Sequence, residues 1–393
     1  MADIDKAIDP EEQEELQVRN RTKGMDIEVD VTEEDPELES FEELEDGTIA
    51  FGNMPEPVDD TEFSANLADL MDDSDLNSLK NDLMGNIDAD KDSRSDWEKT
   101  YKDGLEYLGM KYEERSQPFE GASGVMHPLL AESVTQFQAQ AYNELLPSQG
   151  PVKTQVLGMT TPDSEAQASR VQEFMNYQLM QIMKEYDPET DQMLFYLPLS
   201  GSAFRKVYYD QNLGRAVSKF IPSEDLIVPY AATDLHSATR ITHVINMSIN
   251  DIKKLQQIGF YSDVDVDSGN MLAEDTDGIQ EEIDDLQGVS PSYNDDDTCK
   301  VYEIHTELDI PGFEDLNAEG EETGIKLPYI VTIANNKVLS VRRNYREEDP
   351  LKQRINYFVH YKFLPGLGFY GFGLTHMIGG LSKASTSILR QLI

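Results

Sequence analysis

The chain has 393 residues, and its 76 acidic residues against 32 basic ones give a formal net charge of −44. A charge of this size repels nucleic acid at long range, so it excludes a protein that grips duplex DNA through a net basic face. The single cysteine, Cys299, excludes an intrachain disulfide and a multi-cysteine metal site, and it favours a reducing, cytoplasmic setting.

Two stretches hold most of the acidity. Residues 1–90 carry a net charge of about −25 and residues 262–298 about −13, which leaves roughly −6 for the rest. We expect residues 1–92 to form a mostly disordered tail, because their few apolar side chains bury too little surface to offset the entropy of ordering. Residues 262–298 predict a long acidic surface loop. The N-terminus lacks a secretory signal pattern, and no window approaches the ~18 apolar residues of a membrane span.

Helical periodicity follows the predicted tail. Ser95 and Glu98 have the spacing of a capping box at the start of a helix. A second helix is expected after Pro128, a short strand over residues 152–157, and a third helix from Thr161. The third helix has an apolar stripe that we expect to face a core, formed by Val171, Phe174, Met175, Leu179, Ile182 and Tyr186.

The apolar period then changes from about 3.6 to 2, which indicates strands. "AFRKVYYD" and "RAVSKFI" predict a strand pair, and "TRITHVINM", "KVYEIHTEL" and "RINYFVHYKF" predict further strands. "YIVTIANNKVLSVRR" predicts a hairpin, since two asparagines tolerate the positive φ of a type I′ turn. Ser248 is the expected cap of a short helix. The fold class is therefore α+β, a helical layer followed by a mostly antiparallel sheet.

A last helix is expected from Leu381, with Ile388, Leu389 and Leu392 on one stripe. No glycine, asparagine or proline stop signal follows it. The predicted organisation is thus a tail over residues 1–92, an α+β domain over 93–380 and the beginning of an incomplete helix over 381–393.

Catalytic motifs are absent from the sequence. It has no phosphate-binding loop, no G-x-S-x-G elbow and no H-E-x-x-H motif, and "GFYGFG" is better explained as a tight turn. A metal triad of His243, His305 and His360 from three strands is unsupported by spacing. We therefore predict no enzymatic activity, no cofactor and no metal site.

Basic residues cluster once, in "VRRNYREEDPLKQR". The cluster consists of Arg342, Arg343, Arg346, Lys352 and Arg354, and acidic residues stand among them. Salt bridges at a subunit or domain contact explain this mixture better than phosphate binding does.

Four long stretches carry a family likeness. They read "RSQPFEGASGVMHPLLAESVTQFQAQAYNELLPSQGPVKTQVLG", "LMQIMKEYDPETDQMLFYLPLSGSAFRKVYYD", "FIPSEDLIVPYAATDLHSATRITHVINMS" and "GFYGFGLTHMIGGLSKASTSILRQLI". Together they resemble portal proteins of tailed bacteriophages, of the short-tailed-phage type. The resemblance covers roughly residues 93–393 apart from the acidic loop, and residues 1–92 do not share it.

The resemblance implies a structural subunit of a homo-oligomeric ring, usually a dodecamer, at one capsid vertex. Such a ring is the channel through which double-stranded DNA passes, without sequence specificity, in packaging and ejection. The implied partners are the terminase, the major capsid protein, scaffolding protein and tail adaptors, with no membrane. The implied location is the virion, after assembly in the host cytoplasm. By the same resemblance, residues 93–380 are the portal wing, and residues 381–393 begin an incomplete stem helix.

Two other functions stay open at this point. One is an acidic adaptor protein whose working part is the N-terminal tail. The other is a metal-dependent DNA-processing enzyme, which needs converging carboxylates with a nearby lysine. No such constellation is identifiable in the sequence.

Overall fold

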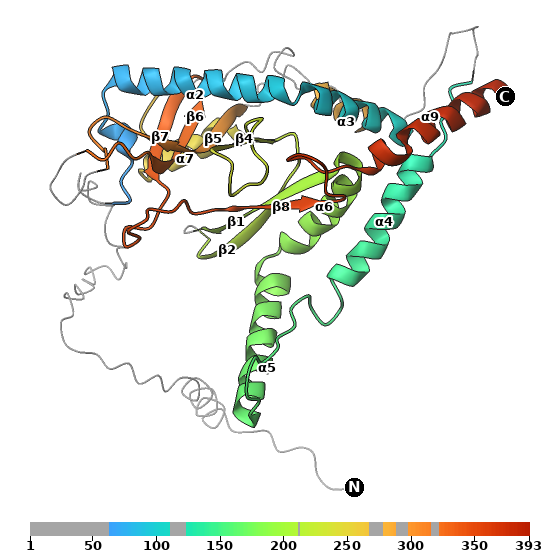
Figure 1. Ribbon diagram of the computed structural model, residues 1–393, viewed down its shortest axis with the longest axis horizontal. Helices are drawn as coiled ribbons and strands as arrows, with labels where there is room; N and C mark the ends of the chain where they lie inside the picture. Colours follow the sequence, from blue (N-terminus) through green and yellow to red (C-terminus); the bar gives the residue numbers. More distant parts are fainter. Residues whose placement is uncertain (1–62, 111–122, 211–212, 267–277, 288–297, 316–321) are drawn as a thin grey trace, which may run out of the picture. The chain divides into compact units, whose positions relative to one another are not determined.

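The computed structural model describes residues 63–110, 123–210, 213–266, 278–287, 298–315 and 322–393 (Figure 1). A series of helices precedes two antiparallel sheets, which confirms the α+β class. The helices before the first strand are η1 (Leu67–Asp69), α2 (Asp73–Ser93), α3 (Ser95–Leu108), α4 (Leu129–Leu145), α5 (Pro162–Tyr177), the π-helical turn η2 (Gln178–Ile182) and α6 (Tyr186–Ser200).

The strands form two sheets, each with only antiparallel neighbours among the described residues. The three-stranded sheet has the order β2–β1–β8, and the five-stranded sheet has the order β3–β4–β5–β6–β7. The strands are β1 (Ser202–Asp210), β2 (Arg215–Ile221), β3 (Leu226–Ile227), β4 (Arg240–Ser248), β5 (Thr298–Leu308), β6 (Leu327–Ala334), β7 (Lys337–Arg343) and β8 (Phe358–Lys362). The other helices in the described part of the chain are α7 (Ile249–Gln257), α8 (Gly278–Gln287) and α9 (Leu374–Leu392).

Local chemistry explains several element boundaries. Asn335 and Asn336 have φ of 44° and 65°, so the predicted hairpin between β6 and β7 is confirmed. Ser248 accepts from the Asp251 amide and caps α7, as predicted. Thr161 caps α5, which begins where the third helix was predicted.

Alternate residues of a strand point to opposite sides of the sheet. Both faces of the five-stranded sheet are covered by other elements. On one face, Ile304 of β5 and Val331 of β6 share a core cluster with Leu83 and Ile87 of α2. Helix α2 therefore lies along this sheet (Figure 1). On the other face, Val301 packs against α7 at one end of the sheet, and the three-stranded sheet lies at the other end.

The three-stranded sheet is also sandwiched. Ala203 of β1 packs against Met193 and Leu197 of α6. Phe204, the next residue, points to the opposite side and joins a cluster with residues of β2, β4 and β8, Phe358 among them. The same face of the three-stranded sheet also makes a hydrogen-bonded contact with the five-stranded sheet.

A third core lies among the helices. Tyr101 and Leu105 of α3, Leu130 of α4 and Leu199 of α6 share one cluster with Ile279 of α8. Helix α9 contacts α3, α4 and α6. No helix in the described part of the chain is long and apolar enough to cross a membrane.

The prediction of a disordered tail is wrong for residues 63–92. They form η1 and α2, and Leu83 is buried against the five-stranded sheet. Leu76, Leu79, Leu83 and Ile87 recur at helical spacing within the acidic stretch, so a narrow apolar stripe is sufficient once a sheet covers it. Residues 1–62 lie outside the described residues.

The predicted acidic loop is also wrong in part. Within residues 262–298 the structure describes helix α8, whose Ile279, Ile283 and Leu286 pack against the helical core. Spacings of four and three residues place these side chains on one helical face. Residues 267–277 and 288–297 lie outside the described residues.

Three smaller expectations also fail. Ser95 is not a cap, because α2 and α3 are separated only by Arg94, whose side chain pairs with Glu98. Residues 152–157 are not a strand, since Val152 bonds to the side chain of Asn176 on α5 instead of a neighbouring strand. The last helix begins at Leu374, seven residues before the expected start.

Candidate functional site

Arg342 and Arg343, the first two residues of the predicted basic cluster, bind backbone groups of their own chain. Arg342 donates to the carbonyl oxygens of Ser64, at 2.7 Å, and Phe260, at 2.8 Å, and its guanidinium lies 4.4 Å from the Phe260 ring centroid. Arg343 donates to the carbonyl oxygen of Phe63 at 3.0 Å. Both arginines therefore fasten the segment before η1 to the end of β7.

The second half of the cluster lies in the loop between β7 and β8. Lys352 forms an ion pair with Asp315. Arg354 donates to backbone carbonyls before β4, that of Leu235 included, at 2.8 Å, and burial lowers the pKa of Arg354. Arg346 is exposed. The structure thus splits the predicted cluster into two intrachain anchors, and its contact with another subunit stays a prediction.

A cleft of about 450 Å³ lies beside the second anchor. Lys326, Lys352 and Arg354 line it together with Glu307 and His236. The lining holds both cations and carboxylates, so its charge favours no single class of ligand.

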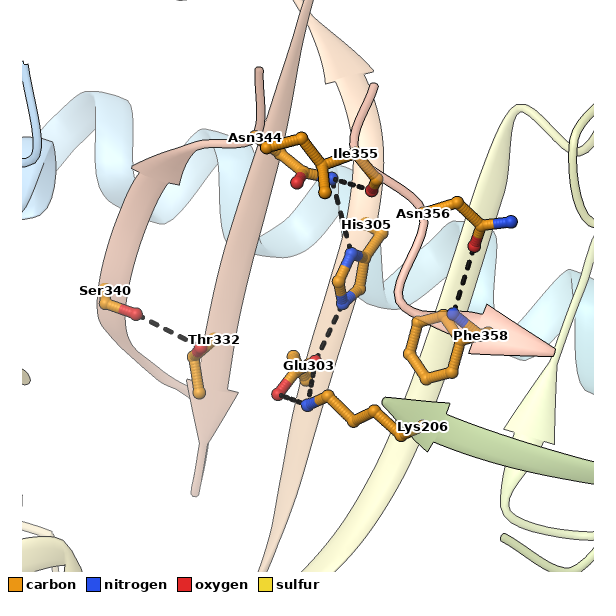
Figure 2. A network of polar contacts seen from close by, with 9 residues as sticks. All are labelled: Lys206, Glu303, His305, Thr332, Ser340, Asn344, Ile355, Asn356 and Phe358. Atoms are coloured by element: carbon orange, nitrogen blue, oxygen red, sulfur yellow. Dashed lines mark hydrogen bonds and ion pairs between the residues drawn. The ribbon is translucent and has the colours of Figure 1, made fainter. Parts of the chain in front are cut away.

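A largely buried polar network joins the two sheets (Figure 2). The Nζ atom of Lys206, on β1, lies 2.6 Å from both carboxylate oxygens of Glu303, on β5. His305 Nε2 lies 2.7 Å from the same carboxylate, and Asn344 lies beside the other ring nitrogen at 3.5 Å. The Asn344 amide also donates to the carbonyl oxygen of Ile355 at 3.2 Å. A neutral ring that donates from Nε2 and accepts at Nδ1 satisfies this arrangement.

The electrostatics of the network follow from its burial. Burial alone raises the pKa of Glu303, but the Lys206 ammonium and the hydrogen bond from His305 outweigh it and hold that pKa well below its usual range. Burial lowers the pKa of His305, against the opposing effect of Glu303. His243 stands opposite Glu303 across the β4–β5 ladder, and burial lowers the pKa of His243 to about 3. The network therefore holds one ion pair and two neutral histidines at pH 7.

This chemistry is that of a structural clamp. His305 is 2% exposed, and among the described residues no serine, threonine or cysteine side chain hydrogen bonds to its ring, so the Glu303–His305 pair activates no nucleophile there. His360 lies elsewhere, 3.1 Å from the Ser202 hydroxyl, and the three strand histidines do not converge. The described part of the chain holds no group of three or more side chains suited to a metal ion.

Helix α5 exposes an apolar stripe to solvent. None of its residues is buried, and Val171, Phe174 and Met175 are 44%, 61% and 45% exposed. The prediction that this stripe faces a core within the chain is therefore wrong for these three residues, whereas Leu179 and Ile182 of η2 and Tyr186 of α6 are half-buried. The periodicity identified a real apolar face, but the described residues of the chain do not cover it.

Helix α9 exposes a second apolar face. Thr375, Gly379, Ser382 and Thr386 face the protein and are buried. Four larger apolar side chains point away and are exposed, namely Met377, Leu381, Ile388 and Leu392, whereas Leu374 and Ile378 pack against the helical core. The expected stripe on this helix is confirmed for Ile388 and Leu392 as an exposed face, whereas Leu389 is half-buried.

Comparison with known proteins gives no identification. No family model matches the chain, and no curated protein matches it. The candidate surfaces must therefore be interpreted from their own geometry and from the sequence resemblance.

Sequence reasoning missed the intersheet network. Glu303 and His305 alternate on one strand and so share a face, which is a signal visible in the sequence. Their partner Lys206 lies 97 residues away on another sheet, and no local pattern announces that pairing.

Proposed function

We propose that this chain is a structural subunit of a portal-type ring, which forms the channel for double-stranded DNA at one capsid vertex. The observation that carries the proposal is the pair of uncovered apolar helical faces on α5 and α9. Monomeric proteins rarely leave such faces open, because apolar surface favours burial by about 25 cal/mol per Å². A subunit that becomes surrounded by copies of itself accounts for both faces at once.

Two further features support this proposal. The α+β fold, with helices before antiparallel sheets and α9 after a glycine-rich turn, agrees with the wing and stem order that the sequence resemblance implies. The basic residues of the predicted cluster mostly bind carbonyl oxygens and carboxylates of their own chain, so few are left to hold phosphates. A channel wall that holds DNA weakly lets the duplex slide.

We propose for this chain the partners and the location that the sequence resemblance implies. As a portal subunit, the chain docks terminase, the major capsid protein, scaffolding protein and tail adaptors, and it resides in the virion after assembly in the host cytoplasm. The intersheet clamp and the arginine anchors then have a mechanical role, since they hold the wing rigid while DNA moves past it. The adaptor alternative depends on residues 1–62, because residues 63–92 are part of the folded core.

Native mass spectrometry with negative-stain imaging tests the proposal. The full chain, purified at micromolar concentration, is expected to give closed rings with an axial hole. A chain that stays monomeric under all assembly conditions, including the presence of scaffolding protein, contradicts it. A DNA-binding titration at about 150 mM salt provides a second readout, in which weak and sequence-independent binding is expected.

A further inference from the structure

Three of the six histidines lie where the two sheets meet. His243 of β4 and His305 of β5 belong to the five-stranded sheet, and their ring centroids lie 5.9 Å and 4.9 Å from that of Phe358 on β8. His360 of β8 belongs to the three-stranded sheet, and its ring centroid lies 4.4 Å from that of Phe204 on β1. Phe204 and Phe358 share one apolar cluster, so all three rings border the same contact between the sheets. We call these five residues the intersheet joint.

The ring of His243 is poorly placed to carry a charge. Its Nδ1 atom is buried and has no hydrogen-bond partner among the described residues. The Glu303 carboxylate stands opposite it across the β4–β5 ladder, but Lys206 already occupies that carboxylate at 2.6 Å. The other groups that act on it are the Lys219 ammonium on β2 and the His305 ring. A proton on His243 therefore adds a cation beside a carboxylate that is already paired.

His360 has no carboxylate beside it. Its Nε2 atom lies 3.1 Å from the Ser202 hydroxyl, and the charged group that acts on it is the Lys362 ammonium of its own strand. Burial and a neighbouring cation both disfavour the charged form of the ring.

His305 is the exception among the three. Its Nε2 atom lies 2.7 Å from the Glu303 carboxylate, which favours a proton on the ring, whereas burial and the cations Lys206 and Arg354 oppose one. These opposing effects make His305 a weaker source of acid response than the other two rings of the joint.

The response of the joint to acid follows from the difference between buried and solvated imidazoles. Burial lowers the pKa of His243 and that of His360 to about 3, from the ordinary value of 6.5. A state in which the joint is open therefore takes up protons as the pH falls below about 6.5, whereas the closed joint takes up few. Each ring favours the open state about 25-fold more at pH ~5 than at pH ~7, and the two together roughly 600-fold more.

We propose that the intersheet joint is an acid-sensitive contact, which opens when His243 and His360 take up protons and lets the three-stranded sheet move away from the five-stranded sheet. The inference does not depend on the proposed function, because it concerns contacts within one chain. Helix α2 packs through Leu83 and Ile87 on the opposite face of the five-stranded sheet, so opening of the joint leaves that core in place.

Hydrogen–deuterium exchange on the full chain at pH ~7 and pH ~5, corrected for the intrinsic pH dependence of amide exchange, tests this opening. We expect the protection of β1 and β8 amides to fall at least about 600-fold between the two pH values. Amides of α2 should still exchange at least about tenfold more slowly than those of β1 and β8 at pH ~5. His243→Gln and His360→Gln should each reduce the fall about 25-fold. The matched control His236→Gln, which changes an exposed ring outside the joint, should leave the fall as it is.

Two results would overturn the inference. Equal protection of β1, β8 and α2 at pH ~5 would mean that the joint opens only when the whole chain unfolds, and this comparison needs no substitution. A fall in protection that His243→Gln and His360→Gln leave unchanged would assign the acid response to other groups.

Discussion

Helices α2 and α5 differ in how far the chain buries their apolar side chains. The sequence of α2 (Asp73–Ser93) is acidic and weakly apolar, yet it buries Leu83 and Ile87 against the five-stranded sheet. The sequence of α5 (Pro162–Tyr177) has a clear apolar stripe, yet none of its residues is buried. Periodicity therefore identifies an apolar face, but it does not say whether the partner that buries this face belongs to the same chain.

Truncation of one large apolar side chain in each helix gives the largest expected difference between them. Ile87→Ala in α2 should lower the free energy of unfolding by about 4 kcal/mol, because Ile87 is 1% exposed and the change leaves a cavity. Phe174→Ala in α5, although it removes a larger side chain, should change the stability of the monomer by less than about 0.5 kcal/mol. Urea unfolding of the monomeric fraction measures both changes, and equal losses would show that the chain buries α5 as well as it buries α2.

The intersheet clamp belongs to the part of the molecule that the chain covers itself. Lys206→Met leaves the Glu303 carboxylate without its cation, so we expect a loss of about 3 kcal/mol. The matched control is Lys254→Met, which breaks an exposed ion pair with Asp251 and should change stability little, because water and salt screen that pair. A cost for Lys206→Met no larger than the control would show that the sheets are held by apolar contacts alone.

The free energy of unfolding should fall in acid because of His243, which stands opposite Glu303 of the clamp. Burial lowers the pKa of His243 to about 3, below the ordinary value of 6.5, so the unfolded chain gains a proton as the pH falls while the folded chain does not. This contribution to stability is complete above pH ~6.5 and is lost progressively below it, by about 2 kcal/mol at pH ~5. His243→Gln should remove that part of the slope in unfolding titrations between pH ~7 and pH ~5. An unchanged slope would place the acid sensitivity in other groups.

The smallest expected effect is local to α5. Thr161→Ala removes the side chain that accepts from the Ser164 amide, which should weaken the helix by about 1 kcal/mol. Because α5 contributes little to the covered core, global unfolding should not change, while amide exchange within α5 should rise about fivefold. A matching loss of global stability would mean that α5 unfolds together with the rest.

Sequence alone located the features that are fixed by neighbouring residues. The β6–β7 hairpin follows from Asn335 and Asn336, and the start of α5 follows from Thr161, since each depends on a few adjacent side chains. The role of α2 required the sheet that covers it, formed largely by strands more than 200 residues later. The clamp required Lys206 and Glu303 to meet across 97 residues. Long-range partners of this kind leave no local pattern.

Assembly of copies of the chain should cover both α5 and α9. Hydrogen–deuterium exchange on the full chain, compared between the monomer and the assembled fraction, tests this coverage most directly. We expect amides of residues 162–177 and 377–392 to exchange at least about tenfold more slowly in the assembly, with residues 73–93 unchanged because α2 is already covered. Assemblies in which α5 exchanges as fast as in the monomer would contradict it.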